Sequence, residues 1–547
     1  MSRAFIGAIA RMLALAAVAG GCGGLRFVER GVVWRDPDDA PITRPRERPV
    51  DVDWSAARSV VLQPIDRFLS LDYGVEAVNV NALDEVPESS WFHDPRRAPD
   101  GGGAARPRAL ATDEMAWGAA TPDDVPVPPL TIVKGKTVGA MLGFVVKDAR
   151  GVRYMVKLDP PGRPGFATSV EVVVSRLAWA CGWRVPKELM IALAPAELRI
   201  APSATAKDER DRARPFLRDD LARMLAPLAA AAGPDGRILV LASRWLAGDS
   251  LGPFRYQGRR SDDPNDRWPH EDRRELRGFG VFSAWVNNVD TLENNTLDMY
   301  EGAPGRGHVV HYQQDVGGAF GVWANQPMRA WMGHETYFDV PHILGALVSL
   351  GLSSGFWVEQ RFLDELRARD AAEPALGAFA AERFDPRAWR PNLPNAAFSR
   401  QTARDRYWAA KRIALVDERE LRAAIAAGRY PADVAGRLYE ILWRRRAAVL
   451  RAYFGAVTAL DYFRVEGGRL CFDDLGAAAG LGAARITASD GGRARAVVSS
   501  VAGGACVEGV AGSGYHVVAL SASRPQARAT PPVRVHVASG RVVGVER

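Results

Sequence analysis

Two aspartates and one asparagine in the middle of this 547-residue sequence have the types and the spacing for chemistry on phosphate groups. Asn295 follows Asp290 by five residues, and Asp315 follows Asn295 by twenty, just before a Gly-Gly bend. In phosphotransfer from Mg-ATP, one carboxylate orients the accepting hydroxyl, while an amide and a second carboxylate hold the metal on the phosphates. The pattern therefore predicts Asp290 as a catalytic base and Asn295 and Asp315 as Mg²⁺ ligands.

The segment before these residues has the pattern of three short strands and a helix. Apolar alternation and turn residues predict the strands over 131–137, 143–147 and 152–158. An apolar face repeating at helical spacing predicts a helix over 169–181. Lys157 lies in the third strand and Glu171 in the first turn of the helix. A lysine at this place would contact phosphate oxygens, and the glutamate would orient it.

Each of these residues also has a purely structural interpretation. Asp290 could cap a helix that begins at Thr291, and a lysine on a strand or a glutamate in a first helical turn is common on protein surfaces. The order of the residues along the chain favours the phosphotransfer interpretation. Lysine, glutamate, aspartate, asparagine and aspartate follow one another on elements that suit each role.

The motif D-x-x-x-x-N, followed by a strand and D-V-G, resembles the catalytic and metal-binding loops of atypical protein-kinase-like proteins, the HipA-type bacterial kinases above all. The resemblance covers about residues 128–330. It implies an α+β fold with a small β-rich lobe and a larger helical lobe, binding of Mg²⁺ and ATP, and phosphate transfer to an unknown protein or small-molecule acceptor. Two features depart from the family pattern: Asn288 stands where ordinary protein kinases have histidine, and no G-x-G-x-x-G is present. A catalytically inactive kinase fold that binds or scaffolds in the cell envelope is therefore the alternative.

A second resemblance, to a group of bacterial lipoproteins, covers most of the chain and implies no function. It rests on the phrases VNALDEVPESSWF, SDDPNDRWPHEDRRELRG and WVNNVDTLENNTLDMY. The N-terminus agrees with it, since a basic start and a short apolar run lead to Ala-Gly-Gly-Cys, which is similar to a lipobox. Cys22 would then carry a lipid that tethers the exported protein to a membrane of the envelope, because the apolar run is too short to span a bilayer.

Composition divides the chain into five regions. They are a signal peptide (1–22), an irregular tether and arm (23–127), the small lobe (128–245), the helical lobe (246–461) and a small all-β, sandwich-like domain (462–547). Residues 35–48 are expected to form an extended tether, and helices are expected over 208–232, 340–350, 403–414, 418–427 and 432–454. Cys471 and Cys506 share the β domain and could pair after export, whereas Cys181 is expected to be a buried thiol.

A hydrolase is the rival enzyme class in this sequence. Gly248-Asp249-Ser250-Leu251 matches the nucleophile block of the GDSL hydrolases, and Asp339 and His342 have the spacing of their base. That block normally opens a catalytic domain, but here it follows more than 220 residues. Nucleic-acid binding is not expected, because the net charge of +7 is scattered and forms no basic stripe.

Overall fold

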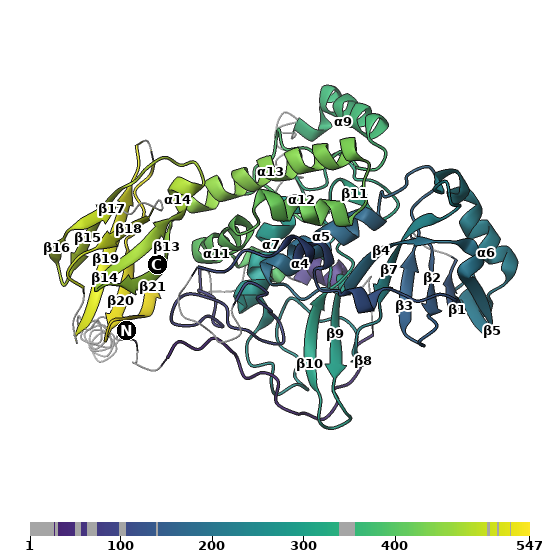
Figure 1. Ribbon diagram of the computed structural model, residues 1–547, viewed down its shortest axis with the longest axis horizontal. Coiled ribbons are helices and arrows are strands. Elements are labelled where there is room, and N and C mark those ends of the chain that lie inside the picture. Colours follow the sequence, from purple (N-terminus) through teal and green to yellow (C-terminus); the bar gives the residue numbers. More distant parts are fainter. Residues whose placement is uncertain are drawn as a thin grey trace, which may run out of the picture.

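The computed structural model describes residues 27, 31–49, 56–62, 74–97, 106–137, 141–337, 356–499, 504–510, 514–525 and 527–547. The expected signal peptide with Cys22, the expected helix over 340–350, and Asp339 and His342 lie outside these residues. The expected α+β class is confirmed. A seven-stranded sheet lies at one end of the molecule and two antiparallel sheets at the other, with most helices between them (Figure 1).

The seven-stranded sheet has the order β4-β7-β3-β2-β1-β5-β6. Its strands are β1 (Leu130–Lys136), β2 (Gly143–Lys147), β3 (Arg153–Lys157), β4 (Lys187–Leu193), β5 (Leu198–Lys207), β6 (Ala213–Pro215) and β7 (Ile238–Arg244). Strands β1 and β5 pair in parallel, and the other neighbours are antiparallel. The three strands predicted before the helix are present within one residue of their expected bounds.

The predicted helix over 208–232 is wrong in its first half. Strand β6 lies there, and the helix α6 (Arg218–Leu225) begins only afterwards, followed by a short 3₁₀ helix, η4 (Ala226–Ala231). The reason is local, because the Asp208 carboxylate accepts hydrogen bonds of 2.9 Å from the backbone N–H groups of Arg210 and Arg212. This side chain closes a tight turn between β5 and β6 and so prevents a helix from starting.

Helix α5 (Thr168–Cys181) covers the sheet and is buried along nearly its whole length. The Asp159 carboxylate orders its start by accepting hydrogen bonds from the backbone of Gly165, Ala167 and Thr168 at 2.7–3.0 Å. Gly182 ends the helix with φ of 106°, a conformation that side chains other than glycine rarely adopt. The helix is therefore fixed at both ends, which fixes Glu171 in its first turn.

The remaining helices form the middle of the molecule around a large apolar core (Figure 1). They are α4 (Thr112–Trp117), α7 (Arg274–Val286), α9 (Gln360–Ala372), α10 (Ala396–Ser399), α11 (Ala403–Ala414), α12 (Glu418–Ala427), α13 (Ala432–Phe454) and α14 (Leu475–Ala478). The predicted helices over 403–414, 418–427 and 432–454 are confirmed. A small sheet of β8 (Asp249–Ser250), β9 (Thr296–Glu301) and β10 (His308–Gln313) lies beside them. The strands β11 (Val322–Trp323) and β12 (Gln326–Pro327) form a separate two-stranded hairpin. Among the described residues, no helix is long and apolar enough to cross a membrane.

Residues 35–48 are extended as expected, but they pack along the body and do not form a free tether. The buried Asp38 carboxylate accepts hydrogen bonds from the backbone N–H and the hydroxyl of Ser90 at 3.0 and 2.7 Å. Ile42 forms a β-bridge with Gly307. Buried polar groups keep such bonds because leaving them unpaired costs free energy, and this anchoring makes residues 35–48 part of the folded body.

The C-terminal region consists of two antiparallel sheets that share one apolar core. One sheet contains β13 (Leu460–Glu466), β14 (Arg469–Asp474), β17 (Val497–Ser499) and β18 (Gly504–Val507), and the other contains β15 (Arg485–Asp490), β16 (Arg493–Arg495), β19 (Tyr515–Ser523), β20 (Val533–Ala538) and β21 (Arg541–Glu546). The first strand begins two residues before the expected boundary at 462. The C-terminal part is all-β as predicted, apart from the four-residue helix α14.

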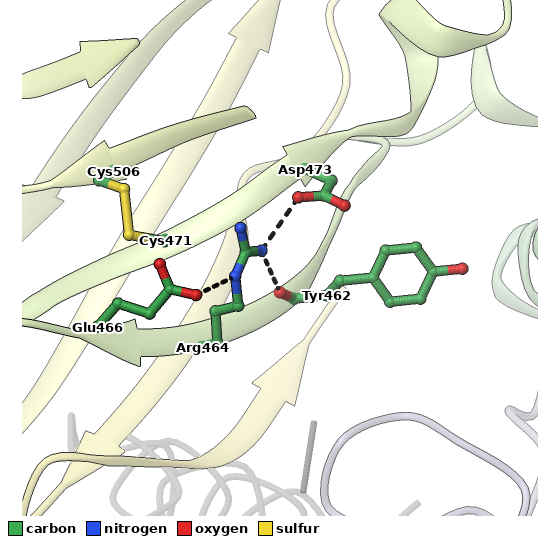
Figure 2. Close-up of a disulfide and its surroundings, with 6 residues drawn as sticks. All are labelled: Tyr462, Arg464, Glu466, Cys471, Asp473 and Cys506. Carbon is green, nitrogen blue, oxygen red and sulfur yellow. Dashed lines mark hydrogen bonds and ion pairs between the residues drawn. A yellow bond between two sulfur atoms is a disulfide. The ribbon is translucent and has the colours of Figure 1, made fainter. Parts of the chain in front are cut away.

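A disulfide joins Cys471 and Cys506, which face each other on neighbouring strands β14 and β18 (Figure 2). Beside it, Arg464 donates hydrogen bonds to the carboxylates of Glu466 and Asp473 at 2.7 and 3.0 Å (Figure 2). Cys181 is buried and free. The pairing that the sequence left open is therefore present, and the expectation of a buried Cys181 is confirmed.

Removing this disulfide should destabilise the β region. The bond closes a loop of 35 residues, and loop closure of that length corresponds to about 4 kcal/mol of lost unfolded-state entropy. The double variant Cys471→Ala, Cys506→Ala should therefore unfold at lower denaturant concentration than the wild type. Denaturant unfolding with and without reductant measures this, because the wild type should respond to reductant and the double variant should not. Equal midpoints for both proteins would contradict the prediction.

Candidate functional site

Lys157, Glu171 and Asp315 meet at one point although they come from three separate parts of the chain. The Lys157 ammonium, at the end of β3, lies 2.7 and 2.8 Å from the two carboxylate oxygens of Glu171 and 3.0 Å from Oδ1 of Asp315. The Glu171 side chain is 4% exposed, that of Lys157 17% and that of Asp315 60%. The group therefore has a buried side at Glu171 and an open side at Asp315.

The Lys157 ammonium interacts with more than one carboxyl group at this point. Burial alone would lower the pKa of the Lys157 ammonium, but the carboxylates of Asp315 and Glu171 outweigh burial and hold that pKa above its ordinary value. The attraction of Lys157 in turn lowers the pKa of Asp315. Burial and the charges of Glu188 and Asp315 raise the pKa of Glu171 to about 8, against the attraction of Lys157. Glu171 therefore keeps its proton at neutral pH, where the charges of Lys157 and Asp315 balance each other.

Glu188 is a third carboxylate at this site, and sequence analysis missed it. It lies on β4, is 2% exposed, and accepts a hydrogen bond from the Ser243 hydroxyl at 3.0 Å. Its other carboxylate oxygen is buried without a hydrogen-bond partner among the described residues. The available sequence signal was a glutamate directly before the apolar run Leu189–Leu193. Burial raises the pKa values of Glu171 and Glu188, and a cation bound nearby would favour the ionised forms of both groups.

Asp290 lies on the loop that follows α7, and the end of the helix and two hydrogen bonds fix its place. Asn287 ends the helix with φ of 57°, and the Asn295 side-chain amide donates to the backbone carbonyl of Asp290 at 2.7 Å. The backbone N–H of Val289 donates to the Gly318 carbonyl at 3.0 Å. A Cβ atom on Gly318 would lie 2.9 Å from the Cβ of Asp290, so glycine is required there. The bend after Asp315 therefore lies directly against Asp290.

The same bend also reaches the ion pair. A Cβ atom on Gly317 would lie 3.4 Å from the Cβ of Glu171, and the backbone N–H of Gln314 donates to the Asn295 carbonyl at 3.0 Å. Asp315 has φ of 50°, which aspartate tolerates better than most residues. The turn after β10 thus contacts the segments that carry Lys157, Glu171, Asp290 and Asn295, and side-chain contacts join Lys157, Glu171 and Asp315.

The environment of Asp290 suits a proton acceptor. Burial and the nearby charge of Asp315 raise the pKa of its carboxyl, and the hydrogen bond from Asn295 lowers it. The resulting pKa is about 6. A general base is most effective when its pKa lies near the working pH. Asp290 is therefore ionised near neutral pH and is a stronger base than an ordinary exposed aspartate.

Asn295 and Asp315 are the residues that could hold a metal. No group of three or more His, Cys, Asp or Glu side chains in the described part of the chain is placed to bind one. Mg²⁺ does not require such a cage, since it is commonly held by one or two side chains together with water and substrate phosphates. The exposed carboxylate of Asp315 fits that mode. The amide oxygen of Asn295 accepts a hydrogen bond from the Asn294 amide at 3.2 Å, which a metal would replace.

Lys136 is a second residue that sequence analysis missed. It pairs with Gly143 across β1 and β2, and Gly143 pairs with Lys157 across β2 and β3. Directly opposed residues point to the same face of a sheet, and a Cβ atom on Gly143 would lie 2.2 Å from the Val156 carbonyl oxygen, so glycine is required between the two lysines. The charge of Lys136 also lowers the pKa of Asp315. The only sequence signal for Lys136 was its position near the end of the strand predicted over 131–137.

The hydrolase residues are not brought together by any described contact. Ser250 is exposed on β8, where it pairs with Met299 of β9. Its predicted partners Asp339 and His342 lie outside the described residues. No protein-family model, curated protein or solved structure matches the chain.

Proposed function

We propose that this protein is a kinase-like phosphotransferase that binds Mg-ATP between a small β-rich lobe and a larger helical lobe. The carrying observation is the contact of one ammonium, Lys157, with Glu171 of α5 and with Asp315 of the loop after β10. In protein kinases a strand lysine pairs with a helix glutamate beside a metal-binding aspartate. Along the chain, a β-hairpin is followed by the strand that ends at Lys157 and by the helix that carries Glu171. This order supports the same proposal.

The residues have separate roles in binding. Lys157 contacts phosphate oxygens and is oriented by Glu171, and Lys136 adds a second positive charge on the same face of the sheet. Asn295 and Asp315 hold the metal. When bound, Mg²⁺ would neutralise charge on the phosphates and would favour the ionised forms of the nearby carboxyl groups.

Asp290 acts on the acceptor. Its carboxylate accepts the proton of the acceptor hydroxyl as that oxygen forms a bond to the γ-phosphorus, and the bond from the γ-phosphorus to the leaving oxygen of ADP breaks. The pKa of about 6 lets Asp290 take up this proton near neutral pH. Asn295 holds the backbone of Asp290 in place through its side-chain amide.

Calorimetric titration of the purified protein with ATP, in the presence and absence of Mg²⁺, tests this function, together with an assay of phosphate transfer. We expect binding that depends on Mg²⁺. Binding without transfer to any acceptor would favour the inactive, scaffolding form of the fold, which Asn288 in place of histidine also favours. The absence of ATP binding to the folded wild type would refute the proposal.

We also propose that the mature protein is tethered to an envelope membrane through a lipid on Cys22. Replacing Cys22 by serine removes the thiol that carries the lipid, so the variant should move from the membrane fraction to the soluble fraction. Fractionation of cells after a salt wash measures this, with Cys181→Ser as the control because Cys181 is buried in the fold. Continued membrane attachment of Cys22→Ser would contradict the tether.

A further inference from the structure

A cavity of about 440 Å³ lies beside the loop that carries Asp290. Its walls come from residues 328–334, from α9, from residues 378–390 and from Arg445 of α13, and Asn287 contributes to the lining. The volume is in the range of small-molecule sites. Trp389 and Phe379 are buried aromatic residues of its wall, so an apolar group could pack there.

The cavity carries excess positive charge. Five arginines line it (Arg329, Arg369, Arg383, Arg390 and Arg445), against three carboxylates (Glu365, Glu382 and Asp385). Glu382 lies 2.8 Å from Arg444 and 3.4 Å from Arg369, and Glu365 lies 3.4 Å from Arg361 and 3.9 Å from Arg383. Arg369 and Arg383 are thus engaged, and the surplus charge of the cavity lies on Arg329, Arg390 and Arg445. Burial lowers the pKa of His334 to about 4, so this lining residue is neutral at pH 7.

Arg445 is the least usual group in this wall. It is 5% exposed, and its guanidinium donates hydrogen bonds to the backbone carbonyls of Ala284, Trp285 and Ala380 at 2.6–2.8 Å. Its charge lies 3.5 Å from the ring centre of Phe384, but no carboxylate of the described residues is within ion-pair distance. Burial lowers the pKa of this guanidinium. A buried cation without a counter-charge is costly, and an anionic ligand would compensate it.

Two contacts connect the cavity to the Asp290 loop. The Trp389 indole N–H donates to Oδ1 of Asn287 at 2.9 Å. The backbone N–H of Asn392 donates to the Val289 carbonyl, also at 2.9 Å. The chain that forms one wall of the cavity therefore also holds the residues just before Asp290, although Asp290 itself does not line the cavity.

We propose that this cavity binds the phosphoryl acceptor, and that the acceptor is a small organic anion with an apolar or aromatic part and a hydroxyl group. Its carboxylate or phosphate lies against Arg445 and Arg390, and its apolar part packs on Trp389 and Phe379. The binding of the anion stands on the cavity alone, whereas its role as acceptor rests on the proposed phosphotransfer.

Binding of two probe anions to the full chain, without nucleotide, tests the cavity. Phenyl phosphate and phenylacetate carry the same ring with a phosphate or a carboxylate, so their relative affinities identify the preferred anion. We expect saturable binding of at least one, weakened at high salt because the attraction is electrostatic. Arg390→Gln and Arg445→Met should each lower the affinity by about tenfold or more. Arg367→Gln on α9, which pairs with Asp364 outside the cavity, should change it by less than about twofold.

The outcomes of the probe-binding experiment can be distinguished from those of the titration with Mg-ATP. If Arg445→Met does not fold, Arg390→Gln decides, because Arg390 is exposed. Lack of saturable binding of both probes to the wild type, or binding that Arg390→Gln leaves unchanged, would overturn the proposed anion site even if Mg-ATP binds. Probe binding by a protein that does not bind Mg-ATP would leave the anion site standing and refute its role in phosphotransfer.

Discussion

Replacing Asp315 by alanine is expected to abolish Mg²⁺-dependent binding of ATP. The variant would leave the metal with Asn295 as its one remaining protein ligand in the proposed site, and Mg²⁺ depends on charged oxygen ligands. The fold should survive, because the Asp315 side chain is 60% exposed and the buried pair of Lys157 and Glu171 stays intact. Calorimetry with ATP and Mg²⁺ measures the loss.

Two further variants separate charge from backbone effects. Asp315 has φ of 50°, which asparagine tolerates well, so Asp315→Asn keeps the turn and removes the charge, and should also bind Mg-ATP poorly. Asp211 is a matched control, since it too has positive φ, at 62°, and it pairs with Lys207 on an exposed surface. Asp211→Ala should bind as the wild type does. Full Mg²⁺-dependent affinity in Asp315→Asn would show that this carboxylate holds no metal.

The elements around Lys157 could be predicted because their signals are local. Strands β1 to β3 alternate in burial between turn residues, and Gly182 ends α5. Strand β5 gives no such signal, since most of its residues are exposed or half-buried and it is held by parallel pairing to β1. That pairing connects segments more than sixty residues apart, so it depends on the tertiary fold and is not visible in a short window of sequence.

The candidate site shows the same limit. The expected positions of Lys157 and Glu171, on a strand end and in a first helical turn, were enough to suggest a contact, and their side chains do meet. Arg445 could not be found in this way, because it is the second of three consecutive arginines in α13. The Arg444 side chain is 57% exposed, whereas Arg445 is 5% exposed. The rotation of the helix against α7 decides which arginine is buried, and the sequence does not state that rotation.

Replacing Asp290 by asparagine should stop phosphate transfer while Mg-ATP still binds. The amide keeps the shape of the side chain but cannot accept the proton of the acceptor hydroxyl, and loss of a general base lowers rates by about 10²–10⁴. Binding should persist because Asp290 is not a metal ligand in the proposed site. In the wild type, transfer should increase as pH rises through about 6, the pKa of Asp290. A variant with unchanged transfer would exclude Asp290 as the base.

The stability of the same variant relative to the wild type should rise from about pH 4 and level off above about pH 6. The pKa of Asp290 is about 6 in the fold, above its ordinary value of 3.8, so the folded state holds the proton more tightly than the unfolded state does. Wild-type stability from this group is therefore full below pH 4 and is lost as pH rises through 6. Asparagine does not ionise, and the variant should gain about 1–3 kcal/mol at pH 8 relative to its difference at low pH. Denaturant unfolding of both proteins at pH 4 and pH 8 measures this, and a stability difference independent of pH would show that Asp290 ionises as freely in the fold as in water.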